Sequence, residues 1–179
     1  MVKSSKVFES ETELPPGVAL VVEGDKIKFT GSGKSLEAKF NSKVVKITVN
    51  GNKVIFHCQG KATRNKVAAA LAAKAHLRNM LAGAKGDFST HLQVIYAHFP
   101  VSIEVKGKEV LIKNFLGEKL PRTANIEGNA KIEVKAQDIY VTGSDKYAVG
   151  QTASNIVRAT MIRLKDRRVF QDGIYPVGD

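Results

Sequence analysis

The sequence contains a single cysteine, Cys58, and no tryptophan. One thiol cannot form an internal disulfide or a cysteine-rich zinc site, which fits a reducing compartment. Cys58 lies in a strand-like apolar run, residues 54–58, so we expect it to be a small buried side chain. The sequence also lacks an apolar run near the roughly 20 residues that span a bilayer, and its first ten residues lack the apolar core of a signal peptide. We therefore expect a cytoplasmic chain with no membrane role.

Motifs of the common enzyme classes are missing as well. There is no Gly-x-Ser-x-Gly nucleophile elbow, no His-x-x-x-His zinc motif and no carboxylate pair in a catalytic context. Residues 31–35, Gly-Ser-Gly-Lys-Ser, resemble part of a phosphate-binding loop, but Lys28 stands where its first glycine is needed and no helical pattern follows. We interpret this stretch as a hairpin turn. The prediction is a non-enzyme with no metal, cofactor or small-molecule substrate, although catalytic groups converging from distant positions stay open as an alternative.

Acidic residues are scarce, with 17 against 28 basic residues and a formal net charge of +11. Such a balance favours an anionic partner, most often nucleic acid. Residues 38–86 contain no carboxylate side chain and ten basic ones. A second basic concentration lies near the C-terminus and comprises Arg158, Arg163, Lys165, Arg167 and Arg168. Charge alone does not rank these two surfaces.

The first half of the chain alternates short apolar runs with turns. Strand-like runs are expected at residues 18–22, 26–30, 36–40, 44–49 and 54–58, and residues 50–52, Asn-Gly-Asn, give a strong hairpin signal. Residues 1–16 are polar and are expected to be an extended lead-in. The period then changes, and a helix is predicted from Thr63 to about Leu81. Its apolar face is expected to comprise Ala68, Leu71, Ala72 and Ala75, and Gly83 and Gly86 are expected to follow it as its stop.

The same pattern returns after Pro100. Six equivalences occur in one order at offsets of 83 to 85 residues: Val18 and Val101, Gly24 and Gly107, Ile47 and Ile132, Val49 and Val134, Lys61 and Lys146, and Ala68 and Ala153. A second helix face is predicted from Ala153, Ile156, Val157 and Thr160. These matches indicate an internal duplication.

We therefore predict an α+β fold of two tandem duplicated domains. Each would be a mostly antiparallel β-sheet packed against one long α-helix. Residues 1–82 would form the first repeat with its lead-in, residues 83–99 a connector that packs on one or both domains, and residues 100–179 the second repeat with a basic C-terminal extension.

The C-terminal extension has apolar residues that a solvated tail rarely carries. The basic cluster is followed by Val169, Phe170, Ile174 and Tyr175. This pattern predicts that residues 158–175, the basic segment, have a fixed shape suited to phosphate recognition. An ordinary charged C-terminus is the alternative. Asp166 and Asp172 are expected to orient arginine side chains.

Three stretches resemble the universal large-subunit ribosomal protein six family in its archaeal or eukaryotic form. They are Tyr-Ala-His-Phe-Pro at residues 96–100, Val-Gly-Gln-Thr-Ala at 149–153, and Asp-Arg-Arg-Val-Phe-Gln-Asp-Gly-Ile-Tyr at 166–175. The resemblance covers almost the whole chain and is weakest over residues 1–15 and 31–43. The lysine- and glycine-rich C-terminal signature of the bacterial form is absent.

This resemblance implies a structural protein of the large ribosomal subunit. It implies contact with large-subunit rRNA near the sarcin-ricin loop, with neighbouring ribosomal proteins, and with translation factors nearby. The rRNA contacts that it implies are Lys146, Gln151, Asn155, Arg158, Arg163, Lys165, Arg167, Arg168, Gln171 and Tyr175. Arginine forks bind phosphate bidentately, amides reach sugar or base edges, and tyrosine stacks on bases. Gln151 and Thr152 are expected near a helix N-terminus that favours phosphate. The alternative function is a free basic nucleic-acid-binding or RNA-chaperone module outside the ribosome.

Overall fold

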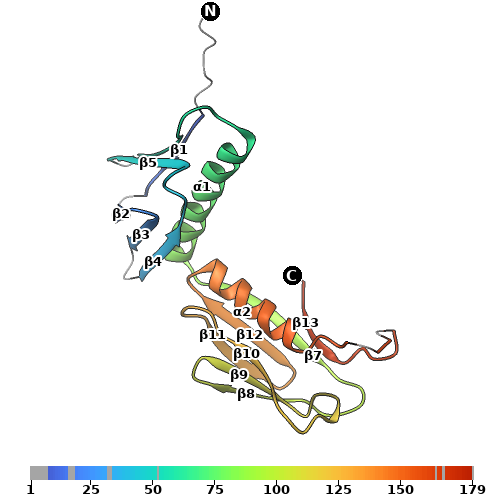
Figure 1. Cartoon of the computed structure of the whole chain (residues 1–179). Helices are drawn as coiled ribbons and strands as arrows, with labels where there is room; N and C mark the ends of the chain where they lie inside the picture. Colours follow the sequence, from blue (N-terminus) through green and yellow to red (C-terminus); the bar gives the residue numbers. More distant parts are fainter. Residues whose placement is uncertain are drawn as a thin grey trace, which may run out of the picture. The chain divides into compact units, whose positions relative to one another are not determined.

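The computed structural model describes residues 8–15, 19–31, 34–51, 53–163, 165–166 and 168–178. The chain divides into two compact units, Met1–Lys85 and Gly86–Asp179 (Figure 1). Both are α+β, and every strand pairing is antiparallel. The expected α+β class with mostly antiparallel sheets and two α-helices is confirmed.

The first unit contains two three-stranded sheets and one helix. One sheet has the order β1 (Glu9–Glu13), β6 (Lys53–Cys58), β5 (Val45–Asn50). The other has the order β2 (Ala19–Glu23), β3 (Lys26–Gly31), β4 (Lys34–Lys39). Helix α1 (Arg64–Lys85) contacts strands of both sheets. Phe29, Phe56 and Leu77 are fully buried in the cores of this unit.

The second unit repeats this pairing order and adds one strand. Its larger sheet runs β11 (Lys131–Lys135), β12 (Asp138–Gly143), β7 (Phe88–Ile95), β13 (Gly173–Pro176). Its smaller sheet runs β10 (Arg122–Asn125), β9 (Glu109–Lys113), β8 (Ser102–Lys106). Helix α2 (Lys146–Ala159) packs on β7, β10, β12 and β13, and the 3₁₀ turn η1 (Phe115–Gly117) lies between β9 and β10.

Residue pairing is also equivalent in the two central hairpins. Ile47 faces Phe56 between β5 and β6, and Ile132 faces Val141 between β11 and β12. The offset of 85 residues inferred from the sequence therefore holds for both partners of this pair. Residues 31–35 are expected to form a hairpin turn. The strands on either side, β3 and β4, pair with each other, and Gly31 is in register with Lys34. Residues 32–33 lie outside the described residues.

The structure differs from the predicted boundaries in two places. The lead-in contains β1, an edge strand that pairs along its length with β6. Within the expected connector, residues 83–99, the chain first completes α1 and then forms β7, which lies between β12 and β13. β7 is therefore an integral strand of the second unit's sheet.

The predicted face of α1 is wrong. Ala68, Leu71, Ala72 and Ala75 are exposed, and the helix instead buries Ala70, Ala73, Leu77, Met80 and Gly83. Residues 67–73 are apolar all round the helix, so their spacing does not distinguish one face from another. Of the two glycines expected as the stop, Gly83 is a buried helical residue, whereas Gly86 directly follows Lys85, the last residue of α1. The predicted face of α2 is confirmed, because Ala153, Ile156 and Thr160 are buried and Val157 is half-buried.

No helix in the described part of the chain is long and apolar enough to cross a membrane.

Candidate nucleic-acid interface

Helix α2 carries four of the predicted contact residues. Lys146 begins the helix, and its Nζ lies 5.9 Å from the centre of the Phe88 ring. Gln151 Nε2 donates to Asn155 Oδ1 at 2.9 Å, and Asn155 Nδ2 donates to the carbonyl of Asn125 at 3.0 Å. Asn155 is therefore held between the helix and β10, and one Nδ2 hydrogen and one Oδ1 lone pair are not used by these two bonds.

The expected phosphate site at the start of α2 is not formed by Gln151 and Thr152. The helix is capped by Asp145, whose carboxylate accepts from the backbone N–H of Tyr147 at 2.9 Å. Gln151 and Thr152 lie in the second turn, where backbone N–H groups are already used within the helix. Thr152 is buried, and its hydroxyl accepts from the N–H of Glu127 at 3.0 Å. The acidic cap also opposes an anion at this end.

A shallow, mostly polar hollow lies between β10 and the last turns of α2. Asn155 and Arg158 line it from the helix, and Thr123, Asn125 and Glu127 line it from the opposite side. Arg158 is exposed in the last turn of α2. The predicted contacts Asn155 and Arg158 are thus brought to one surface, together with β10 residues that sequence reasoning did not single out.

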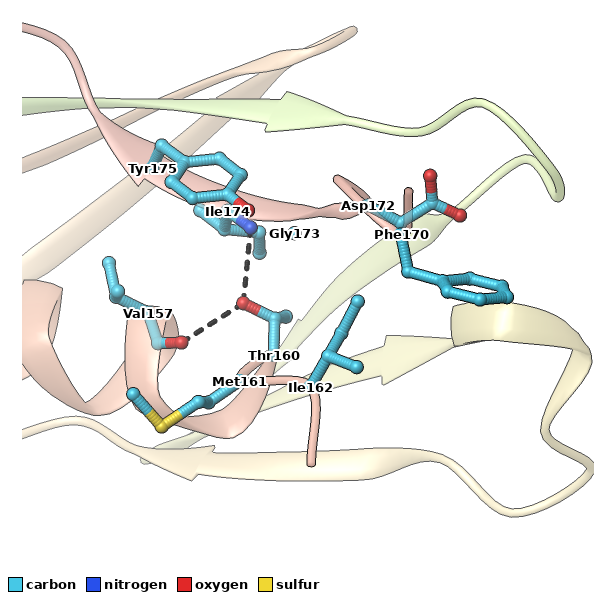
Figure 2. A pocket seen from close by; sticks show the side chains of 9 residues that line it. All are labelled: Val157, Thr160, Met161, Ile162, Phe170, Asp172, Gly173, Ile174 and Tyr175. Atoms are coloured by element: carbon cyan, nitrogen blue, oxygen red, sulfur yellow. Dashed lines mark hydrogen bonds between the residues drawn. The ribbon is translucent and has the colours of Figure 1, made fainter. Parts of the chain in front are cut away.

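Beyond α2, a hydroxyl group joins the helix end to the C-terminal strand. The Thr160 Oγ1 donates to the Val157 carbonyl at 3.0 Å and accepts from the backbone N–H of Ile174 at 3.1 Å (Figure 2). Thr160 is only 3% exposed, and Ile174 is buried beside it. The two ends of the basic segment are consequently held against each other.

The basic segment itself is arranged by a turn around Asp166. Its carboxylate accepts from the backbone N–H of Arg168 at 2.9 Å, and its carbonyl accepts from the N–H of Phe170, also at 2.9 Å. Lys165 Nζ lies 4.5 Å from the centre of the Phe170 ring. Arg163, Lys165 and Arg168 are all exposed, while Arg167 lies outside the described residues.

Two further predicted contacts follow this turn. Gln171 Nε2 donates to the Arg168 carbonyl at 3.3 Å, and the Tyr175 hydroxyl donates to the Gln171 carbonyl at 3.2 Å. Tyr175 pairs with Gln93 in the sheet and keeps 39% of its surface exposed. Its ring is therefore fixed at the surface, and part of it remains exposed for contact.

Asp172 has a different role from the expected orientation of arginines. It is 2% exposed, and its two carboxylate oxygens lie 2.8 Å from the Ala97 nitrogen and 3.1 Å from His98 Nδ1. The His98 ring stacks on Phe170 with 5.3 Å between centroids. Two of the three stretches that carry the family resemblance, residues 96–100 and 166–175, are therefore in contact through a buried carboxylate.

Sequence reasoning missed Arg122 and the loop before it. Arg122 makes two hydrogen bonds with the Glu118 carboxylate, at 2.6 and 2.8 Å, and its Nη1 donates to the Ala159 carbonyl at 3.0 Å. Hydrogen bonding from Arg122 holds the pKa of Glu118 below its ordinary value, and Glu118 in turn raises the pKa of Arg122. The only signal in the sequence was the i, i+4 spacing of Glu118 and Arg122.

Within the described residues, no group of three or more histidine, cysteine or acidic side chains is placed to hold a metal ion. Three of the four histidines form single pairs with a carboxylate, such as His91 Nε2 with Asp138 Oδ1 at 2.8 Å.

Comparison with known proteins places this chain among ribosomal proteins. The sequence model of the family described as Ribosomal protein L6 matches residues 99–173. A protein of Archaeoglobus fulgidus named large ribosomal subunit protein uL6 is 41% identical over 99% of this chain and 93% of its own length. A protein of the same name from Methanobrevibacter smithii is 38% identical over 98% of this chain and 97% of its own length. Another, from Methanocella arvoryzae, is 39% identical over 92% of this chain and 93% of its own length.

Proposed function

The chain belongs to the ribosomal protein L6 family, whose members are structural and non-enzymatic, and on that premise we propose how it holds RNA. It is a constituent of the large ribosomal subunit that binds rRNA. The contact surface runs along the second unit, from the outer face of α2 to the basic segment that precedes β13. It lies near the sarcin-ricin loop, with translation factors docking close by.

The observation that carries this proposal is that described residues at both ends of the basic segment are tied to the rest of the second unit. Arg163, Lys165 and Arg168 are exposed, but their backbone is tied at one end by Thr160 and at the other by Asp172. None of these three cations has an ion-pair partner within 4.0 Å among the described residues, so their charge is available to phosphate. Phosphate contacts from a preordered segment avoid the entropy cost that a flexible basic tail incurs on binding.

The wider set of contacts comprises the ten residues that the resemblance implies. Lys146, Arg158, Arg163, Lys165, Arg167 and Arg168 would neutralise phosphates, and Gln151, Asn155 and Gln171 would reach sugar or base edges. Tyr175 would stack on a base. Most of these contacts address the RNA backbone, so we expect recognition of RNA shape more than of base sequence.

The equivalent strand pairings of the two units also support an internal duplication. We infer that both units descend from one module, with residues 83–99 as the junction. On this interpretation β13 and the basic segment are additions to the second copy, and they distinguish its RNA-binding surface.

A double substitution, Arg167→Ala with Arg168→Ala, tests the proposal. Binding of the full chain to in vitro transcribed large-subunit rRNA should weaken, and the slope of log K against log salt should become shallower by up to about two units. Lys106→Ala with Lys108→Ala, at the exposed turn between β8 and β9, is the matched control. An unchanged slope in the first variant would show that these arginines do not neutralise phosphate.

Co-sedimentation distinguishes the ribosomal assignment from a free RNA-binding module. The chain should remain with large subunits through a moderate-salt wash, because several phosphate contacts and neighbouring proteins hold it. Loss of the chain in that wash, with RNA binding intact, would favour the free module.

A further inference from the structure

The loop between β9 and β10 has an unusual backbone. Asn114 and Leu116 have φ values of 58° and 52°, and Gly117 follows at 77°. The left-handed region is unfavourable for residues with a side chain, above all for a leucine. Such a conformation persists where its surroundings impose it, and it is concentrated at binding and catalytic sites.

Contacts on several sides impose this conformation. Asn114 Nδ2 donates to the Pro100 carbonyl at 3.0 Å, and Phe115 is buried. A side chain on Gly117 would meet the Phe99 ring at 3.4 Å, so the loop lies closely against the bend of residues 97–99. The loop is therefore rigid at its base.

Arg122 fixes the far side of the loop to the end of α2. It stacks over the Phe115 ring at 4.5 Å, holds Glu118 with two hydrogen bonds, and donates to the carbonyls of Ala159 and Met161 at 3.0 and 3.4 Å. Glu118 is the loop's one acidic residue, and Arg122 neutralises it. The loop consequently presents no unpaired negative charge.

At the tip, this scaffold exposes an apolar side chain next to a cation. Leu120 is 81% exposed, the highest value among the exposed large hydrophobic residues of the described chain. Lys119 precedes it and is also exposed, with no ion pair within 4.0 Å among the described residues. Arg122 donates a hydrogen bond to the Met161 carbonyl, so the loop adjoins the basic segment. The charge of Lys165 also helps to lower the pKa of Glu118, which places Lys165 near the loop.

We propose that Lys119 and Leu120 form a second RNA-contacting element, continuous with the basic segment. Leu120 would pack into the wide, shallow minor groove of an rRNA helix, and Lys119 would bind the flanking phosphate. That groove is open enough for a side chain to enter, and double-stranded RNA is recognised there by shape and by sugar and phosphate contacts. RNA is favoured over a protein partner, because Lys119 precedes Leu120 and Lys165 lies near the same loop. No other large apolar residue within residues 114–121 is exposed, although Phe99 and Met161 beside the loop are. The inference rests on the proposed rRNA-binding function.

Affinity measurements on the full chain test the element. Leu120→Ala should weaken binding to in vitro transcribed large-subunit rRNA about tenfold at unchanged salt slope, because it removes apolar contact only. Lys119→Ala should weaken binding and make the slope shallower by about 0.9 units. Leu71→Ala on the exposed face of α1 and Lys108→Ala are matched controls and should bind like the unsubstituted chain. Leu120→Met should retain binding.

The outcomes separate this inference from the proposed function. If Leu120→Ala and Lys119→Ala bind like the unsubstituted chain while the arginine double variant is weakened, the loop does not contact RNA. If the unsubstituted chain binds the rRNA no better than an unrelated duplex of equal length, the proposed function fails. Normal RNA affinity with loss from large subunits would assign the tip to a protein contact and overturn the inference.

A directed cleavage experiment locates the contact. Cys58 is buried and is the only cysteine, so Leu120→Cys carries a single accessible thiol for an iron chelate that generates hydroxyl radicals. Cuts should appear on both strands of one rRNA helix, offset across its minor groove. Absence of cuts near the tip in assembled large subunits, with cuts from a matched Val169→Cys variant, would contradict the proposal.

Discussion

Asp172 is the residue on which the position of the C-terminal segment depends. Its buried carboxylate bonds to the Ala97 nitrogen and His98, which belong to a part of the chain some seventy residues earlier. We expect Asp172→Ala to lower the free energy of unfolding of the second unit by about 1–3 kcal/mol, because the part-buried N–H of Ala97 would lose its charged acceptor and His98 its partner. Asp172→Asn should cost less, since its amide oxygen can still accept from Ala97. Urea denaturation measures both.

Glu133→Gln is the control for these substitutions. Glu133 is an exposed carboxylate. Its one ion pair among the described residues, with Lys135 at 3.8 Å, is also exposed, so its loss should change stability little. Hydrogen exchange should also show faster exchange at residues 170–175 in Asp172→Ala. Equal stability of the alanine variant and the unsubstituted chain would mean that the Asp172 contacts do not hold the segment.

Thr160 has a comparable role at the other end of the segment. Thr160→Val preserves the shape of the side chain but leaves the buried N–H of Ile174 without an acceptor. We expect a loss of about 1–3 kcal/mol in the free energy of unfolding. Thr160→Ser keeps the hydroxyl and should lose less than about 1 kcal/mol, for the missing methyl group. The opposite order of the two variants would show that methyl packing is the larger contribution.

At the scale of elements, the loop before β10 depends on the Glu118–Arg122 pair, which makes its stability sensitive to acid. The folded pKa of Glu118 is lowered from the ordinary value of 4.5, chiefly by hydrogen bonds from Arg122. The stabilisation is therefore complete above about pH 4.5 and is lost as the pH falls through the lower folded pKa. Because the Glu118 side chain is 40% exposed, we expect less than about 1 kcal/mol.

Glu118→Gln measures this contribution. The difference in urea midpoint between this variant and the unsubstituted chain should be largest near pH 6 and should shrink below pH 4. Other paired carboxylates, such as Glu104 with Lys113, titrate equally in both proteins and cancel from the difference. A difference that stays constant with pH would show that the ionised carboxylate does not stabilise the loop.

The two helices show what periodicity predicts and where it fails. In α2, polar residues separate the apolar ones, so Ala153, Ile156, Val157 and Thr160 could be assigned to the buried face from spacing alone. In α1, seven successive apolar residues occupy every direction around the axis, and tertiary packing alone decides that Ala70 and Ala73 are inside.

The basic stretch of the candidate site is visible in the sequence as a charge pattern. The contacts of Asp172 and Arg122 are not, because their partners are brought together only by the fold.

At the scale of the whole molecule, the strand limits decide which part of the chain can fold by itself. β1 escaped sequence reasoning because Glu-Ser-Glu-Thr-Glu has no apolar residue to reveal its alternation. The strand character of β7 is visible in the sequence, but its sheet neighbours β12 and β13 are distant along the chain, so the sequence does not show which unit it joins. The apolar cores themselves are separate: one is made only of residues 88–174, the others only of residues 8–84.

We therefore expect residues 86–179 to fold alone, with a cooperative melting transition and with the rRNA affinity of the full chain largely retained. A fragment of residues 100–179, which begins at the boundary predicted from sequence, should not fold. Without β7 it loses the buried Leu92, which pairs with β12 and β13, and the buried Val94, which pairs with β13. It also loses the Ala97 and His98 contacts of Asp172. Circular dichroism melts and amide proton dispersion compare the two fragments. Cooperative folding of the shorter one would show that β13 and α2 can complete the sheet without β7.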